Sequence, residues 1–130
     1  MKNIEAKIDT GAYTCALHCH TIAEKELGGK KVLCFFLLDP SHEEYHQTEH
    51  VFFDYSRKKI KSSSGEFEER YIIKTIVRLG RRRIRTTISL TDRGNMRYPV
   101  LIGRKLLRGK FIVDVSRMHT NGILFKKAFL

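Results

Sequence analysis

The stretch Ala6-Lys7-Ile8-Asp9-Thr10-Gly11-Ala12 ends an apolar-alternating segment with a carboxylate, a hydroxyl and a glycine. A second stretch, Tyr98-Pro99-Val100-Leu101-Ile102-Gly103-Arg104-Lys105-Leu106-Leu107, carries another short apolar run into a glycine and an arginine. Taken alone, an Asp-Thr-Gly sequence is a common strand-ending turn, because Asp and Gly suit turn backbones. The two stretches together indicate more than a turn, and they decide the fold that we expect.

The pair of stretches resembles the half-site of retroviral-type aspartic proteases, in which a strand ending in Asp-Thr/Ser-Gly-Ala meets a later strand running into Ile-Gly-Arg. The match is closer to a bacterial and archaeal group of retropepsin-like domains that has been labelled ATP-dependent zinc proteases. Three further segments resemble that group: Ala16-Leu17-His18, Lys61-Ser62-Ser63-Ser64-Gly65 and Leu90-Thr91-Asp92-Arg93. The resemblance covers residues 4 to about 117. It implies an all-β, retropepsin-like closed barrel with one short helix, as a single domain over residues 1–130.

The resemblance makes Asp9, Thr10 and Gly11 the candidate catalytic residues. Hydrolysis by this route needs two carboxylates that share a proton, so that one activates water while the other protonates the developing oxyanion. Glycine permits a tight bend beside the carboxylate, and a threonine hydroxyl can both donate and accept. Because the sequence contains a single Asp-Thr-Gly, a working site requires two chains related by a two-fold axis. We therefore expect a homodimer.

The residues that the resemblance implies for substrate binding are Ala12, Ser62, Ser63, Ser64, Gly65 and Arg104. In retropepsins the hairpin between the two key strands is a flap that folds over substrate. A small, polar tip suits a lid that opens for entry and closes to exclude water. One departure concerns Tyr13, which stands where retroviral enzymes carry an acidic partner for the arginine. Arg104 must therefore find another partner or face substrate.

The composition narrows the compartment and the class of protein. The 130 residues suffice for one domain with an adequate core. Three cysteines, without a charged-then-apolar leader, favour free thiols in a reducing, cytoplasmic compartment. The longest apolar run, residues 32–38, is far below the roughly 18 residues of a membrane span. We expect a buried strand there and no membrane partner.

Positive charge is concentrated in the second half of the chain. Residues 1–69 hold nine Lys and Arg against twelve Asp and Glu, whereas residues 70–130 hold sixteen against two. Such an excess attracts polyanions. It predicts an acidic peptide or protein substrate. The dense cluster at residues 78–85 is also compatible with a solvated hairpin tip or with nucleic acid, although we expect nucleic acid less than an acidic peptide.

Apolar residues recur with a period of two over much of the chain. Residues 71–79 and 84–90 alternate in this way around a Gly80-Arg81-Arg82-Arg83 turn, which predicts a β-hairpin. Residues 104–108, followed by Gly109, predict the one short helix. Residues 111–115 then resume an apolar pattern, which predicts a further strand.

The sequence supports a metal site or a nucleotide site less than it supports the aspartic half-site. His42, Glu43 and His46 match the bare His-Glu-x-x-His pattern, and His50 follows. A zincin needs that pattern on a packed helix, whereas no apolar stripe accompanies it here, so a solvated loop is the simpler interpretation. The sequence does not match a phosphate-binding loop, because Lys110, after Gly109, is followed by Phe111 rather than Ser or Thr. We expect no metal and no cofactor. His18 and Cys19 lie near the aspartate loop, but neither is assigned a catalytic role.

The sequence thus predicts an aspartic-type peptidase or amide hydrolase that acts as a homodimer. Acidic peptides of the polyglutamate type are the candidate substrates. The resembled group is associated with ligases that append glutamates to proteins, which suggests that substrate. Two alternatives stay open. One is a non-catalytic basic β-module that binds an acidic partner or nucleic acid. The other is a zinc hydrolase centred on His42 and His46.

Overall fold

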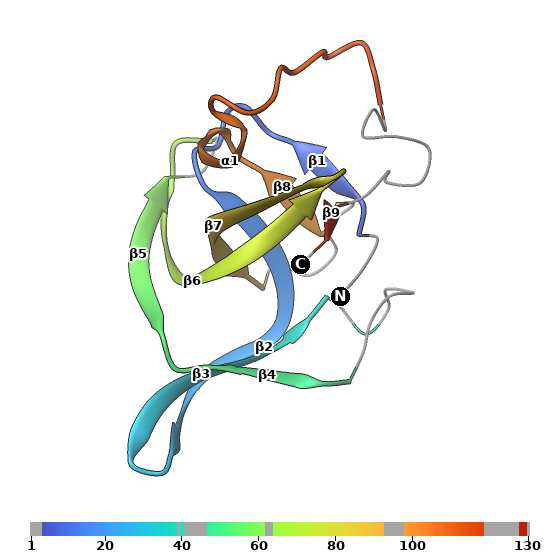
Figure 1. Ribbon diagram of the computed structural model, residues 1–130. Coiled ribbons are helices and arrows are strands. Elements are labelled where there is room, and N and C mark those ends of the chain that lie inside the picture. The colour runs from blue at the N-terminus through green and yellow to red at the C-terminus, as the bar shows by residue number, and fades with distance from the viewer. Residues whose placement is uncertain are drawn as a thin grey trace.

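The computed structural model describes residues 4–38, 40, 47–61, 64–92, 98–118 and, for the backbone alone, 128–129. The described part is built from strands and one short helix (Figure 1). The elements are β1 (Ala6–Ile8), β2 (Cys15–Leu27), β3 (Lys30–Leu37), β4 (Glu49–Phe52), β5 (Tyr55–Lys61), β6 (Phe67–Leu79), β7 (Arg82–Thr91), β8 (Val100–Ile102), α1 (Arg104–Leu107) and β9 (Ala128–Phe129). The expected all-β architecture with one short helix is confirmed. No helix in the described part is long enough to cross a membrane, since α1 has only four residues.

Strand β8 lies between β1 and β2, although β1 and β2 are neighbours in the chain. The order along the main sheet is β1-β8-β2-β7-β6-β5. Strand β8 runs parallel to β1, with Ile8 opposite Ile102, and antiparallel to β2, with Ala16 opposite Leu101. The carboxyl ends of β1 and β8 therefore lie side by side. This places the residues that follow each strand, the aspartate loop and α1, at one end of the molecule (Figure 1).

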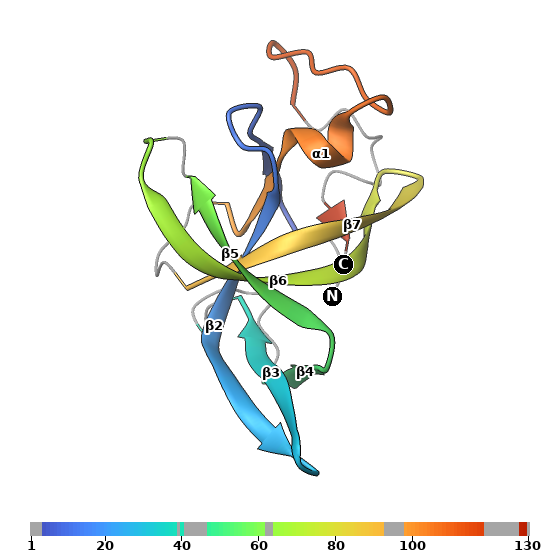
Figure 2. The same cartoon turned by 90° about the vertical axis from the view of Figure 1, so that its left-hand side faces the viewer.

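Strand β2 belongs to two parts of the sheet because it bends in its middle. Its first residues pair with β7 and β8, and its later residues pair with β3. The register shifts between His20 and Ala23, and Thr21 has a left-handed φ of 54°, which is uncommon for a β-branched residue. A bulge of this kind bends a strand and increases its twist. As a result the β2–β3 hairpin projects away from the end that carries α1 (Figure 2).

The described sheet is not closed into a barrel, so this part of the expected fold needs correction. Among the described pairings, β1 joins only β8 and β5 joins only β6. The bend at Thr21 carries the second half of β2 out of the main sheet to pair with β3 instead. The sheet therefore folds over on itself without its two outer strands pairing.

The core is formed by side chains of the main sheet and of β3. Its fully or nearly fully buried side chains include Leu17, Cys19, Leu33, Phe35, Ile73, Val77, Ile88 and Leu90. These residues alternate along their strands, as a period of two requires when one face is buried. Toward the end of β7 both faces are buried, since Ser89 is 1% exposed and its Oγ donates to the Cys15 carbonyl at 3.1 Å. The expected buried strand at residues 32–38 is confirmed by β3.

The predicted hairpin and helix are both present. Strands β6 and β7 pair from Tyr71 opposite Leu90 to Leu79 opposite Arg82, and Gly80 supplies the turn with a left-handed φ of 64°. Helix α1 ends before Gly109, whose φ of 73° is also left-handed. Glycine is favoured at such positions because it carries no Cβ.

The expected strand at residues 111–115 is absent. Asp114 instead organises a turn, accepting hydrogen bonds at its Oδ1 from the backbone N–H of Ser116 at 3.0 Å and from the Ser116 hydroxyl at 2.6 Å. The side chains of Ile112 and Val115 are almost completely exposed. An apolar pattern therefore occurs here without a partner strand among the described residues, and the local Asp-x-Ser turn determines the backbone.

Candidate active site

The loop after β1 is held by its own aspartate and by β8. The backbone N–H of Asp9 donates to the Ile102 carbonyl at 2.9 Å, which continues the β1–β8 ladder by one residue. The N–H of Gly11 donates to Asp9 Oδ1 at 3.0 Å, and the N–H of Ala12 donates to the Asp9 carbonyl at 3.2 Å. Such side-chain-to-backbone bonds are typical of Asp in turns. Asp9 is half-buried, while Thr10 and Gly11 are exposed, so this loop presents its carboxylate at the surface.

Gly103 is required where the start of α1 meets the aspartate loop. A Cβ at position 103 would lie 2.6 Å from the Tyr13 carbonyl oxygen and 2.7 Å from the Thr14 carbonyl oxygen. Backbone N–H groups then join the two segments, because Arg104 donates to the Ala12 carbonyl and Lys105 to the Tyr13 carbonyl, each at 2.9 Å. The two stretches, distant in the sequence, therefore meet at this contact, as the family resemblance implied.

Tyr13 stands where retroviral enzymes carry an acidic partner for the arginine, and Arg104 contacts other groups instead. Its Nη1 donates to the Thr10 carbonyl at 2.8 Å, and its guanidinium carbon lies 5.8 Å from the centre of the Tyr13 ring. A guanidinium can make both contacts at once because it is planar and carries several donors. Arg104 thus supports the loop from which Asp9 projects, while its role in substrate binding stays a prediction.

Two polar contacts behind the loop were not anticipated from the sequence. Lys105 Nζ donates to Thr87 Oγ1 at 2.9 Å, which joins α1 to β7. Ser89 similarly joins β7 to Cys15. Thr87 and Ser89 alternate with apolar residues along β7, so only their pairing across the fold could identify them.

The thiols near the loop are buried. Burial raises the pKa of Cys15, and burial also raises the pKa of Cys19 well above its ordinary value. Reactive cysteines need a thiolate. Both groups therefore behave as small apolar side chains in the core.

The hairpin expected to form the flap is present. Strands β5 and β6 pair from Tyr55 opposite Ile73 to Lys61 opposite Phe67. Ser64 and Gly65 are exposed near its tip, where Gly65 has a left-handed φ of 90°; Ser62 and Ser63 lie outside the described residues. Figure 2 shows this tip at the same end of the molecule as the aspartate loop and α1. The role of this hairpin as a lid over Asp9 stays a prediction.

The histidine-rich segment can be followed only in part, because His42 and His46 lie outside the described residues. His50 is half-buried in β4, and its ring stacks on Phe35 with 5.7 Å between ring centres. Burial lowers the pKa of His50. In the portion of the chain that the structure describes, no group of three or more His, Cys, Asp and Glu could hold a metal ion.

The arginine-rich hairpin tip divides its side chains between the fold and solvent. Arg82 donates from Nη1 to the Lys110 carbonyl at 3.0 Å, and its guanidinium lies over the Phe111 ring at 5.5 Å. Arg81 and Arg83 are exposed. Part of the cluster therefore ties the segment after α1 to β7, whereas binding of an anionic partner by the exposed part stays a prediction.

Comparisons with known proteins agree with this arrangement. Residues 1–122 match the RimB-like family, described as the retropepsin-like aspartic endopeptidase RimB. A relative from Shewanella halifaxensis named "Probable alpha-L-glutamate ligase" is 34% identical over 121 residues, which are 92% of this chain and 26% of that protein. A relative from Parasynechococcus marenigrum with the same name is 26% identical over 93% of this chain and 26% of its own length. The chain thus spans about a quarter of the length of the curated relatives it matches.

A solved structure is also similar. A Legionella pneumophila protein of unknown function matches with a TM-score of 0.55 and 28% identity, over 78% of this chain and 70% of that one. The likeness to known proteins therefore extends from sequence to three-dimensional structure over about three quarters of this chain.

Proposed function

This chain belongs to the RimB-like family of retropepsin-like aspartic endopeptidases, and on that premise we propose that it is an aspartic-type peptidase or amide hydrolase whose site is completed by a second copy. The observation that carries the proposal is the half-site itself. Asp9 projects from a loop that is held to the start of α1 by three hydrogen bonds, two from the backbone N–H groups of Arg104 and Lys105 and one from the Arg104 guanidinium. Such rigidity suits a group that must be positioned for general acid–base chemistry.

The chemistry requires two such loops facing each other across a two-fold axis. Two Asp9 carboxylates close together cannot both ionise readily, so one keeps a proton. The ionised carboxylate takes a proton from water, which attacks the amide carbonyl, and the other carboxyl group protonates the developing oxyanion. The proton is later delivered to the leaving amine. Each chain supplies one Asp9, because its loop contains one carboxylate.

An acidic peptide is the substrate class that we propose. The excess of positive charge in residues 70–130 favours anionic partners. The relatives are named as glutamate ligases, and joining glutamates creates amide bonds within an acidic chain. Hydrolysis of amide bonds between glutamates is a reaction that an aspartic half-site in this family could perform.

The test compares Asp9→Asn with the wild-type chain on α-linked oligoglutamate, with release of amine measured over a range of pH. Asn keeps an acceptor oxygen for the Gly11 N–H but cannot exchange a proton, so we expect a loss of at least about 100-fold with an unchanged unfolding curve. Asp54→Asn is a matched control, since Asp54 is an exposed aspartate outside the loop. Wild-type activity in folded Asp9→Asn would exclude the aspartic mechanism. Activity lost in EDTA and restored by zinc would promote the hydrolase centred on His42 and His46.

A basic binding module is the second candidate, favoured by the exposed Arg81 and Arg83. Sedimentation at increasing concentration separates the two. A dimer is expected for the hydrolase, whereas a strict monomer that binds nucleic acid saturably, without hydrolysis that depends on Asp9, would support the module. Substituting Arg81 and Arg83 by Gln should weaken that binding, and salt should weaken it further.

A further inference from the structure

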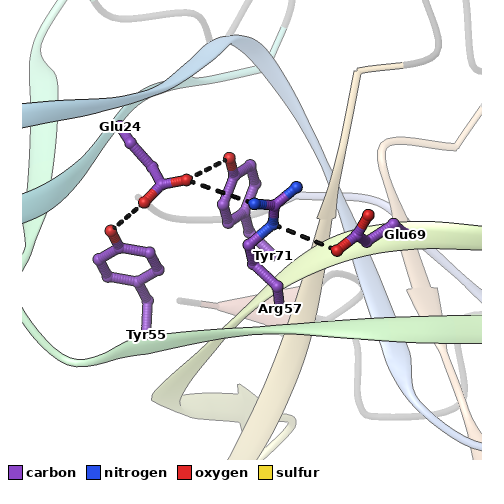
Figure 3. A network of polar contacts seen from close by, with 5 residues as sticks. All are labelled: Glu24, Tyr55, Arg57, Glu69 and Tyr71. Atoms are coloured by element: carbon purple, nitrogen blue, oxygen red, sulfur yellow. Dashed lines mark hydrogen bonds and ion pairs between the residues drawn. The ribbon is translucent and has the colours of Figure 1, made fainter.

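Away from the aspartate loop, one carboxylate lies among three donors from two other strands. Glu24, on the second half of β2, accepts a hydrogen bond from the Tyr55 hydroxyl at 2.7 Å and another from the Tyr71 hydroxyl at 2.9 Å. The Arg57 guanidinium approaches the same carboxylate, with Nη1 3.8 Å from Oε1. Figure 3 shows these groups converging on Glu24 from β5 and β6. We call Tyr55, Arg57 and Tyr71 the carboxylate cradle.

The cradle is held together by contacts that do not involve Glu24. Arg57 and Tyr71 are opposite each other in the β5–β6 register, and the guanidinium lies 5.5 Å from the centre of the Tyr71 ring. The Tyr55 and Tyr71 rings meet edge to face at 6.0 Å. Arg57 Nε also contacts Glu69 at 3.4 Å. The donors are therefore positioned by their own hairpin, and they would remain positioned if Glu24 turned away.

The chemistry of the cradle selects an ionised carboxylate. Hydrogen bonds from Tyr55 and Tyr71 lower the pKa of Glu24, and the bond to Glu24 raises the pKa of Tyr55 to about 12. Two neutral phenols and one cation form charge-assisted contacts with a carboxylate. A carboxylate supplied by another chain would receive the same three contacts.

The cradle is open to solvent and leads toward the tip of the hairpin. The side chain of Glu24 is 28% exposed and that of Arg57 is 53% exposed. Side chains two residues apart share one face of a strand, so Lys59 and Lys61, both exposed, continue from Arg57 toward Ser64 and Gly65. Four residues of strand span about 13 Å. An extended acidic peptide could therefore place one carboxylate in the cradle and others beside the lysines.

We propose that the carboxylate cradle is a binding subsite for an acidic side chain of the peptide substrate, and that Glu24 occupies this subsite when substrate is absent. The proposal rests on the proposed function, and it adds a location for substrate recognition on the hairpin that carries the expected flap. Glu24 lies on a different strand from the donors, so rotation of one flexible side chain would empty the cradle. Substrate then competes with an internal carboxylate of the same chemistry.

The experiment measures the affinity of α-linked tetraglutamate by calorimetry at one ionic strength, with every variant carrying Asp9→Asn so that no hydrolysis intervenes. Glu24→Ala empties the cradle, and Glu26→Ala is the matched control, because Glu26 is an exposed glutamate on the same face of the same strand. Both remove one negative charge. We expect Glu24→Ala to bind roughly tenfold tighter than Glu26→Ala, since it alone removes a competitor that would otherwise occupy the cradle about nine-tenths of the time.

Tyr55→Phe and Tyr71→Phe are then added to Glu24→Ala. These changes keep the rings and the net charge but remove one donor each, so each should weaken binding by roughly threefold to tenfold. Equal affinities for Glu24→Ala and Glu26→Ala, or no effect of either phenylalanine, would overturn the subsite. Because binding is read in a chain without its catalytic carboxylate, this outcome is independent of the proposed hydrolysis. If hydrolysis depends on Asp9 but is unchanged by the cradle variants, the subsite alone is refuted. If the expected binding pattern is found but the wild-type chain shows no hydrolysis, the enzyme assignment alone is refuted.

Discussion

Replacing Gly103 by alanine should destabilise the chain and loosen the aspartate loop. The added Cβ would lie 2.6 Å from the Tyr13 carbonyl oxygen, 2.7 Å from the Thr14 carbonyl oxygen and 2.8 Å from the Thr14 carbonyl carbon. All three atoms belong to the backbone, so no side chain can rotate to make room. Gly103 has an extended conformation with φ of −86°, which alanine adopts without strain. The expected effect is therefore a steric one.

The magnitude follows from the contacts at this position. Forcing an extra carbon into a close-packed site costs about 1–3 kcal/mol. The shift needed to relieve it would also weaken the flanking bonds from Arg104 N to Ala12 O and from Lys105 N to Tyr13 O, each worth about 0.5–1.5 kcal/mol. We expect Gly103→Ala to lower the free energy of unfolding by about 2–4 kcal/mol.

Urea unfolding and amide hydrogen exchange together test this reasoning. Gly109→Ala is the control: a Cβ there meets nothing within 4 Å, but φ is 73°, so it should lose about 1–2 kcal/mol through backbone strain alone. Only Gly103→Ala should speed exchange at the amides of Arg104 and Lys105. A Gly103→Ala chain within about 0.5 kcal/mol of wild type, a size typical of surface changes, with protection of both amides retained, would refute the tight approach.

Three further predictions concern Arg104, Tyr55 and Cys19. Arg104→Lys keeps the charge but cannot both reach the Thr10 carbonyl and stack on Tyr13, so urea unfolding should show a loss of about 1 kcal/mol; an unchanged curve would contradict that role. Tyr55 should ionise near pH 12 in an ultraviolet titration and nearer its ordinary pKa in Glu24→Gln. Because its folded pKa is raised, its contribution to stability is present below the unfolded pKa of about 10 and is lost as pH rises toward the folded value. Cys19 is fully buried and burial raises its pKa, so iodoacetamide at pH 8 should label it only once urea unfolds the chain; rapid labelling of the folded chain would contradict this.

Where a structural feature depends on neighbours in the sequence, the sequence predicted it well. The turn at Gly80 and the end of α1 at Gly109 follow from residues that tolerate a left-handed backbone. The same local rules misassigned residues 111–115, because an apolar alternation describes a strand only if a partner edge is present. The closed barrel, which the family resemblance implied, is not found in the described sheet, because β1 and β5 do not pair there. The bend at Thr21 was also not predicted, since a left-handed backbone is uncommon for a β-branched residue.

By itself the sequence determined the chemistry of the candidate site: a lone Asp-Thr-Gly after an alternating strand, and a distant Gly-Arg that its family pairs with it. Only the tertiary structure decided how Arg104 is used once Tyr13 replaces an acidic residue, and only it brought Glu24 to Tyr55 and Tyr71, which lie 31 and 47 residues further along the chain. The physical reason is that periodicity and turn preferences act over a few residues. Contacts between side chains on β2, β5 and β6 depend instead on where the bend in β2 sends its second half.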